Sequence, residues 1–401
     1  MESRTKPAYN FRDIPTGIWV LGFVSMLMDI SSELIHSLLP IYLVTVLGTS
    51  ALTVGVIEGI AEAAASITKV FSGILSDWLG KRKLLVAIGY GLAAFTKPVF
   101  PLASSVGWLV SARFIDRVGK GIRGAPRDAL VADIAPAHLR GASFGLRQSL
   151  DTIGAFAGPL LAIVLMWRTA NNFRVVFWVA VIPAFLSLAL VIFAVQEPER
   201  QGGLGRVTSP LSLTRLRRLG QAYWWVVAIA TIYTLARFSE AFLVLRAQSI
   251  GLPIMLAPAI MIVMNVVYAV AAYPAGMLSD RVDRLVVLMI GLGLLIVADL
   301  FLALSPGLAG VVIGVVLWGL HMGFTQGILA SLIADAAPAD LRGTAYGMFN
   351  LLGGAAILAA SVMAGALWEV SGPEATFLGG AAFTAVALLG LLFIRGRIKP
   401  A

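Results

Sequence analysis

Apolar runs of roughly 20 residues recur along the whole chain, and short polar stretches separate them. As a helix, each run is long enough to cross about 30 Å of hydrocarbon. The chain is 59% hydrophobic and only 13% charged, whereas a soluble domain carries about a quarter charged residues. A soluble core of this length could not bury so much apolar surface. The sequence therefore predicts an all-α integral membrane protein.

The runs predict twelve membrane-spanning helices, six in each half of the chain. The first six are expected at about 17–47, 52–76, 83–103, 106–131, 142–167 and 174–195. The second six are expected at about 222–249, 253–278, 285–304, 309–334, 343–368 and 375–394. The polar stretch between them is the longest in the chain. It divides the protein into an N-terminal bundle (1–195), a linker (196–221) and a C-terminal bundle (222–401).

Lysine and arginine are concentrated in alternate connections between these helices. The connections around Gly48, Ser104, Pro306 and Gly372 hold no lysine or arginine. Because basic residues favour cytoplasmic loops, both termini and the linker are predicted to be cytoplasmic. The net charge of +9 is explained by this topology rather than by nucleic-acid binding. The polar N-terminus is not expected to act as a cleavable signal peptide, and the expected location is the cytoplasmic (inner) membrane.

Two motifs occur twice, about 200 residues apart. VADIAPAHLRG at 131–141 matches IADAAPADLRG at 333–343, and GILSDWLGKRK at 73–83 matches GMLSDRVDRLV at 276–286. Each copy has the same place relative to the helices of its half. Two six-helix bundles of common descent, arranged around a central site, are typical of transporters.

The motif GILSDWLGKRK resembles a family pattern. The spacing G-x-x-x-D-x-x-G-[RK]-[RK] is met by Gly73, Asp77, Gly80, Lys81 and Arg82, and it is similar to the loop between helices two and three of the major facilitator superfamily. In that family the loop latches the cytoplasmic side. The resemblance covers nearly the whole chain and implies a cytoplasmic gate, whose further members would be Asp133, Arg140, Asp280, Arg281, Asp335 and Arg342. The alternative is that Pro136 and Pro338 only end helices and that these charges are solvated.

The fifth predicted helix carries a second resemblance. Gly145, Gly154, Gly158 and Pro159 match the spacing of a pattern found in exporters of the same superfamily, although its closing pair of glycines is absent. Family members with this pattern tend to be antiporters, so the resemblance implies export. Close helix packing through small residues is the alternative explanation.

Many charged residues fall inside the predicted helices of the first half. A charge at mid-bilayer costs at least about 2.5–3.5 kcal/mol, so these side chains are expected to face one another or a hydrated cavity. The acidic and basic groups are present in similar numbers, which predicts a polar interior held by ion pairs. The residues predicted to couple transport to protons are Asp29, Glu33, Glu58, Glu62, Arg113 and Asp116.

Arg113 matches an arginine of the superfamily's fourth helix that is linked to proton transfer, so it is expected either to couple transport or to form a structural ion pair. A carboxylate that feels both burial and a nearby cation can titrate near neutral pH. Glu33 is the first choice for the proton carrier and Asp29 the second. Ser32-Glu33 also resembles Ser239-Glu240 in the second half.

The substrate is expected between the two bundles. The residues predicted to bind it are His36, Lys97, Arg117, Lys120, Arg123, Arg237, Glu240, Asn265, Gln326 and Asn350. The fourth helix carries basic residues at three- and four-residue steps along one face, here called the basic stripe: Arg113, Lys120, Arg123 and Arg127, with Asp116 among them. The basic stripe favours an anion or a zwitterion, whereas the acids of the first two helices favour a cation. The predicted function is secondary active transport of a small organic molecule by alternating access, with export driven by proton entry as the leading form.

Two alternatives remain open at this point: proton-coupled uptake of an anionic metabolite, and export of a metal ion. The second would use Asp29, Glu33 and His36, which share one helical face. The chain has no cysteine and three histidines, so a metal site is not expected. No constellation of nucleophile and base indicates an enzyme. We expect a monomer in the lipid bilayer, with the proton gradient as its energy source and no cofactor.

Overall fold

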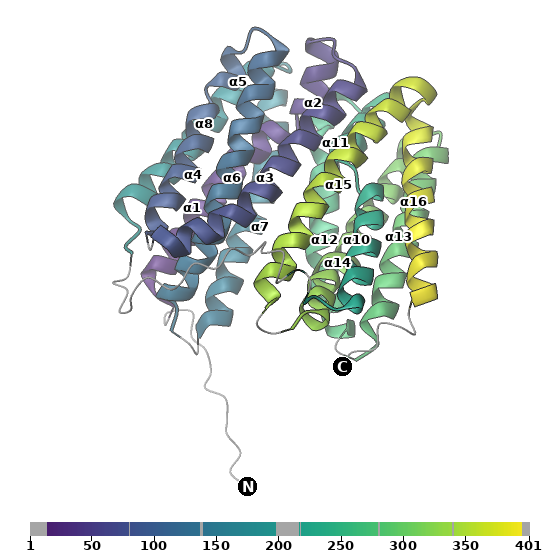
Figure 1. Ribbon diagram of the computed structural model, residues 1–401. Coiled ribbons are helices and arrows are strands. Elements are labelled where there is room, and N and C mark those ends of the chain that lie inside the picture. The colour runs from purple at the N-terminus through teal and green to yellow at the C-terminus, as the bar shows by residue number, and fades with distance from the viewer. Residues whose placement is uncertain are drawn as a thin grey trace.

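The fold is taken from a computed structural model, which describes residues 14–79, 81–136, 139–197, 216, 218–279, 281–338 and 341–394 (Figure 1). The first half contains α1 (Thr16–His36), α2 (Leu39–Ile41), the π-helix η2 (Tyr42–Val46), α3 (Ala51–Leu79), α4 (Arg82–Thr96), α5 (Val99–Leu102), α6 (Val106–Ile134), α7 (Arg140–Arg168) and α8 (Phe173–Phe193). The second half contains α10 (Gln221–Ala236), α11 (Ala241–Ser249), the short 3-10 helix η4 (Ile254–Leu256), α12 (Pro258–Ser279), α13 (Arg284–Leu304), α14 (Leu308–Ala336), α15 (Arg342–Ser371) and α16 (Pro373–Ile394). The described residues form no strand, which confirms the all-helical prediction.

Each predicted span coincides with a helical segment to within a few residues. In the described part of the chain, 11 segments are long and apolar enough to cross a membrane. The twelfth, α6, has 29 residues, and at about 1.5 Å per residue it is also long enough. It is less apolar than the other 11 segments because it carries the basic stripe. Much of the predicted linker 196–221 lies outside the described residues.

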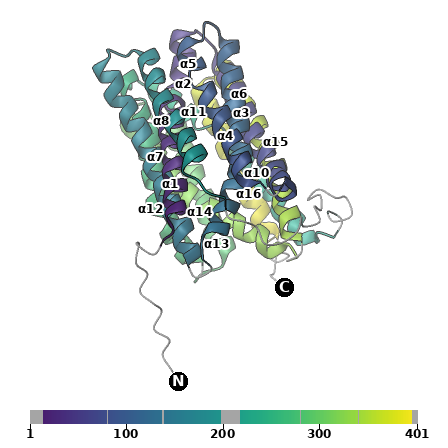
Figure 2. The same cartoon turned by 90° about the vertical axis from the view of Figure 1, so that its left-hand side faces the viewer.

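The two halves stand side by side and meet along two helix pairs. In Figure 1 the first half is purple to teal and the second half is green to yellow. α3 packs against α15, and α7 packs against α12. Figure 2 shows these two contacts on opposite sides of the molecule. Helix α1 begins and α16 ends at the bottom of Figure 1. We call this end of the molecule the lower end and the opposite end the upper end.

The halves are tightly packed at the upper end. A Cβ atom on Gly365 of α15 would lie 2.7 Å from the Cα of Leu52 and 2.8 Å from the carbonyl oxygen of Ala51. Gly55 of α3 likewise packs directly on the backbone of Ser361. One apolar cluster, which includes Leu34, Phe100 and Phe177 of the first half and Phe242 and Phe377 of the second, extends across both halves. Together these contacts exclude water from the interface near the upper end.

Three of the long membrane-spanning segments are interrupted along their length. The first span breaks after His36, where two residues separate α1 from α2. The third span breaks at Lys97-Pro98, where proline cannot continue the hydrogen-bond ladder. The seventh breaks at Arg237–Glu240, between α10 and α11. Irregular backbone within a membrane protein is tolerated where it is buried in protein or lines a cavity. These breaks therefore direct attention to the space between the halves.

Candidate substrate and proton site

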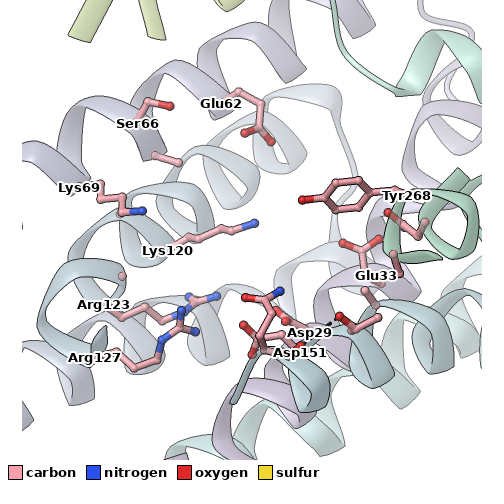
Figure 3. Close-up of a pocket in the computed structure, with 18 of the residues that line it drawn as sticks. Asp29, Glu33, Glu62, Ser66, Lys69, Lys120, Arg123, Arg127, Asp151 and Tyr268 are labelled. Carbon is pink, nitrogen blue, oxygen red and sulfur yellow. Dashed lines mark hydrogen bonds between the residues drawn. The ribbon is translucent and has the colours of Figure 1, made fainter. Parts of the chain in front are cut away.

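A cavity of about 660 Å³ lies between the halves, in the middle and lower parts of the helices (Figure 3). It is bounded by α1, α3, α6 and α7 of the first half and by α12 of the second. Its charged and hydrogen-bonding lining residues are Asp29, Glu33, Glu62, Ser66, Lys69, Lys120, Arg123, Arg127, Gln148, Asp151, Thr152, Asn265 and Tyr268. The site is thus polar on the first-half side and uncharged on the α12 side.

Charges of opposite sign face each other across this cavity. Figure 3 shows Lys69, Lys120, Arg123 and Arg127 along one wall. Asp29, Asp151 and Glu33 lie opposite, from α1 and α7, and Tyr268 of α12 closes a third side. The predicted polar interior of the first bundle is therefore present, and it opens onto the interface with the second.

A smaller cavity region of about 240 Å³ adjoins the first, and both regions are lined by Glu33, Glu62, Lys120, Ala155 and Asn265. The smaller region reaches the break in the seventh span. Its further charged or polar lining residues are His36, Arg117, Arg237, Ser239 and Glu240. The non-helical backbone at Arg237–Glu240 therefore lines a cavity near the middle of the seventh span.

Ion pairs join helices in the cavity walls and behind them. Arg113 donates to the Oε2 of Glu58 at 2.8 Å, and Nη2 of Arg117 lies 2.6 Å from Oε1 of Glu62. Both pairs connect α6 to α3. Lys97, at the break of the third span, donates to Asp116 at 2.9 Å and to Ser32 at 3.1 Å.

His36 connects two of the acids. Its Nε2 lies 3.4 Å from Glu58, and its Nδ1 lies 3.7 Å from Glu33. Glu58 is fully buried and already receives Arg113. Glu33, in contrast, borders both cavity regions. The chain of contacts Arg113–Glu58–His36–Glu33 thus leads from the protein interior to the cavity.

The predicted site residues fall into three groups. Asp29, Glu33, Glu62, His36, Arg117, Lys120, Arg123, Arg237, Glu240 and Asn265 line one or both cavity regions. Glu58, Arg113, Asp116 and Lys97 instead lie in buried ion pairs that do not border either region in this conformation. Gln326 accepts a hydrogen bond from Tyr268 at 3.3 Å, and Asn350 borders neither region.

The metal-ion alternative required Asp29, Glu33 and His36 to act together. His36 is engaged by Glu33 and Glu58 instead. Within the described ranges, no group of three or more histidine, aspartate or glutamate side chains is arranged to hold a metal ion. The ligand set for this alternative is therefore not assembled in that part of the chain.

The glycines of the helix-five motif pack α7 against α1. A Cβ atom on Gly154 would lie 2.6 Å from the carbonyl oxygen of Met26 and 2.9 Å from the Cβ of Asp29, and one on Gly158 would lie 2.7 Å from the Cβ of Glu33. Gly145 has no such neighbour. Pro159 lies inside the continuous helix α7. Two of the glycines thus hold the helix that carries Asp29 and Glu33 in place.

Some of the residues predicted to form a cytoplasmic gate lie at the lower end. Arg82 forms an ion pair with Asp133 and donates to the carbonyl oxygen of Ala129 at 2.6 Å, and its backbone N–H donates to Glu197. These contacts join α4, α6 and the segment after α8 within the first half. Gly73 packs near Ala125 of α6, and Lys81 and Arg281 are exposed. The side chains of Asp77, Arg140, Asp335 and Arg342, and the residues Gly80 and Asp280, lie outside the described part of the structure.

Replacing Arg82 with alanine is expected to reduce the free energy of unfolding by about 1.5–3 kcal/mol, because a charge-assisted contact between α4 and α6 is lost. Thermal denaturation of the purified protein in detergent would measure the change. Lys81→Ala removes the same charge from an exposed neighbouring side chain and is expected to cost less than about 0.5 kcal/mol. Equal losses in both variants would contradict the assignment.

Several site residues were not among those predicted from sequence. Ser66, Lys69, Arg127, Gln148, Asp151 and Tyr268 line the main cavity. Arg127 donates to Ser25 at 2.9 Å, and Arg147 donates to Asp151 at 2.7 Å. Arg127 belongs to the basic stripe of the fourth predicted helix, but it was not included among the predicted site residues. The placement of Lys69 depends on how α3 is rotated against α6, which the sequence pattern alone does not determine.

The comparison with known proteins agrees with this geometry. The sequence profile of the Major Facilitator Superfamily matches residues 21–361 and, in a second match, 247–401. The chain belongs to the major facilitator superfamily. It is 33% identical over 393 residues to the uncharacterized MFS-type transporter MJ1317 of Methanocaldococcus jannaschii, with 96% of each chain covered.

Two further comparisons are with a resistance protein and with a solved structure. The quinolone resistance protein NorA of Staphylococcus aureus is 26% identical over 219 residues, which is 54% of either chain. The crystal structure of a POT family transporter in complex with 5-aminolevulinic acid superimposes with a TM-score of 0.80 at 14% identity, covering 97% of this chain and 98% of that one. The protein is therefore a multi-pass membrane transporter with the alternating-access fold of the superfamily, and it is not an enzyme.

Proposed function

We propose that this transporter moves a charged small organic molecule across the cytoplasmic membrane and couples that movement to protons. The supporting observation is the polar cavity between the halves, which contains Glu33 at the junction of its two regions. The positive-inside pattern assigns the lower end to the cytoplasm. With the upper end packed shut, the conformation described here corresponds to a state that faces the cytoplasm.

Glu33 and Asp29 are the best candidates for the proton carrier. A carrier must reach cavity water and must not be fixed by a permanent cation. Glu58 and Asp116 are buried in ion pairs, and Glu62 is paired with Arg117 at 2.6 Å. Glu33 contacts only His36 among basic groups within 4 Å in the described structure. Asp29 forms no ion pair within that distance in the same part of the chain, although Asp151 and three cations of α6 are in electrostatic range.

Replacing Glu33 with glutamine is expected to abolish transport driven by a pH gradient and to preserve exchange of substrate across the membrane, because only the proton-binding step is removed. Proteoliposomes with an imposed pH gradient and a panel of charged and neutral compounds provide both measurements. Glu369→Gln, at an exposed site in α15, is the matched control. Unchanged pH dependence in Glu33→Gln would exclude Glu33 as the carrier, and loss in Asp29→Asn alone would assign the role to Asp29.

Export in exchange for protons is the proposed direction. The helix-five spacing at Gly154, Gly158 and Pro159 supports it, and so does the similarity to NorA, since resistance is expected of a transporter that removes a compound from the cell. In proteoliposomes an outward proton gradient and an inward one would then have opposite effects on the accumulated compound. Accumulation on the same side as the entering protons would contradict export.

A specific observation favours proton-coupled uptake of an anion as the second candidate. Asp29 lies within electrostatic range of Lys120, Arg123 and Arg127, and of the like-charged Asp151. A proton on Asp29 would free these cations to bind an anion, so the two ligands would bind together. Joint binding of proton and cargo is the requirement of symport. The direction measured in proteoliposomes decides between the two candidates.

A further inference from the structure

We propose that the main cavity recognises its cargo by an anionic group, a carboxylate or a phosphate, bound between Lys69, Lys120 and Arg123. This inference rests on the proposed transport function and specifies the chemistry of its cargo. The three cations come from two helices, α3 and α6, and line the same wall (Figure 3). Their ammonium and guanidinium groups supply the donors that carboxylates and phosphates require.

The wall is built by close helix contacts through glycine. A Cβ atom on Gly121 of α6 would lie 2.6 Å from the carbonyl oxygen of Ala65 in α3, and Gly124 lies beneath the stem of Lys69. On the other side of α6, a Cβ atom on Gly119 would lie 2.7 Å from the carbonyl oxygen of Gly89 in α4. These contacts fix the rotation of α6 and bring Lys69 to the cations of α6. The cluster is therefore a consequence of the packing and not of mobile surface side chains.

The cations of this wall are not neutralised by the protein. Lys69, Lys120 and Arg123 form no ion pair within 4 Å in the part of the chain that the structure describes. Arg123 is only 4% exposed, stacks 4.7 Å from the ring centre of Tyr90, and has its Nη1 buried without a hydrogen-bond partner. A buried guanidinium that keeps an unused donor next to a cavity is prepared for a ligand that accepts hydrogen bonds.

The acids of the cavity do not balance these cations. Glu62 is paired with Arg117, Asp151 with Arg147, and Glu33 contacts His36. Asp29 is the remaining carboxylate of the lining without an ion pair within 4 Å among the described residues. Glu33 is likewise without a permanent cation, since histidine is charged only when protonated. Three unpaired cations therefore face two such carboxylates, which leaves an excess of positive charge. An anionic cargo would compensate this excess, and a cationic one would increase it.

The opposite wall indicates the rest of the cargo. α12 contributes Asn265 and Tyr268, which are uncharged and able to donate or accept hydrogen bonds. The cavity volume of about 660 Å³ exceeds what a single carboxylate or phosphate group needs. The cargo is therefore an organic anion with a polar, uncharged body that faces the second half.

Binding to the purified full-length protein in detergent micelles, without any gradient, tests this inference separately from transport. Phenyl phosphate, benzoate, benzyl alcohol and benzyltrimethylammonium share one aromatic ring and differ in charge, and equilibrium dialysis measures each affinity. We expect at least one of the two anions to bind more tightly than the alcohol, and the cation to bind most weakly. The two anions distinguish a phosphate from a carboxylate preference.

Lys120→Gln and Lys69→Gln are expected to weaken binding of the preferred anion roughly tenfold or more, because each removes a charged donor. Both side chains are exposed within the cavity, so folding does not depend on them as it does on Arg123. Arg168→Gln removes one positive charge from an exposed site at the upper end and is expected to leave the affinity unchanged. Equal or tighter binding of the cation, no binding of either anion, or unaltered anion affinity in both lysine variants would overturn the inference. Anion binding without any transport would instead count against the proposed function.

Discussion

Replacing Arg113 with methionine is expected to reduce the free energy of unfolding by about 3–5 kcal/mol and to abolish transport. The substitution leaves the carboxylate of Glu58 fully buried, with His36 at 3.4 Å as its remaining basic partner within 4 Å among the described residues. Breaking a buried ion pair by removing one member has a cost of this size because the other charge is left without a partner. Titration of the purified protein from a mild into a denaturing detergent, followed by tryptophan fluorescence, measures the change.

A double variant separates the role of the pair in folding from its role in transport. Arg113→Met combined with Glu58→Met replaces both charges by apolar side chains, and such replacements are often neutral or stabilising. We expect the double variant to recover most of the lost stability and to remain inactive, if the contacts from Glu58 through His36 to Glu33 serve proton coupling. A double variant that is both stable and fully active would show that the pair has only a structural role.

Replacing Gly365 with alanine is expected to shift the protein out of the conformation described here. A methyl group at this position would press on the backbone of Ala51 and Leu52 in α3, at the closed upper end. Overpacking of a tight contact costs about 1–3 kcal/mol, which corresponds to a roughly 5- to 150-fold change in the ratio of two conformations. The population with an open upper end should rise accordingly.

The chain contains no cysteine, so single-cysteine reporters can measure this shift without a background. Val54→Cys is buried at the upper end and should react faster with a maleimide in the Gly365→Ala variant, whereas Ser66→Cys in the main cavity should react more slowly. Gly353→Ala, on the same helix, is the matched control. A Cβ atom at this position would meet no neighbouring atom within 4 Å. Equal labelling rates in the two glycine variants would contradict a conformational role for the upper contact.

The spans were predictable from sequence because a bilayer imposes a length and an apolar composition on every helix. A helix break at Lys97-Pro98 was also predictable, because proline cannot donate the backbone hydrogen bond that a continuous helix needs. The break at Arg237–Glu240 was not, because the segment contains neither proline nor glycine. Its position is set by tertiary contacts such as that between the Ser239 backbone N–H and the Ser361 hydroxyl, at 3.1 Å.

The charges of the site were predictable as a set, and their pairing was not. The sequence indicated that acids of the first two helices face the bases of the fourth. Which of Glu58 and Glu62 meets Arg113 depends on how α3 and α6 are rotated and shifted, and glycines such as Gly121 control that placement. Asp116 was expected among the proton-coupling groups, yet it meets Lys97 on the side of α6 that faces α4.

The glycine contacts that fix α6 have a consequence for how this transporter can diversify. Positions 89, 119 and 121 cannot accept a larger side chain without separating helices, so mutation has little freedom to rearrange the basic wall. Gly319 and Gly323 of α14 hold α12 by similar contacts, so what can vary on the α12 wall is its uncharged lining side chains, Asn265 and Tyr268. Descendants of this protein are thus expected to keep the charge they select for and to acquire new cargo shapes through substitutions in the second half.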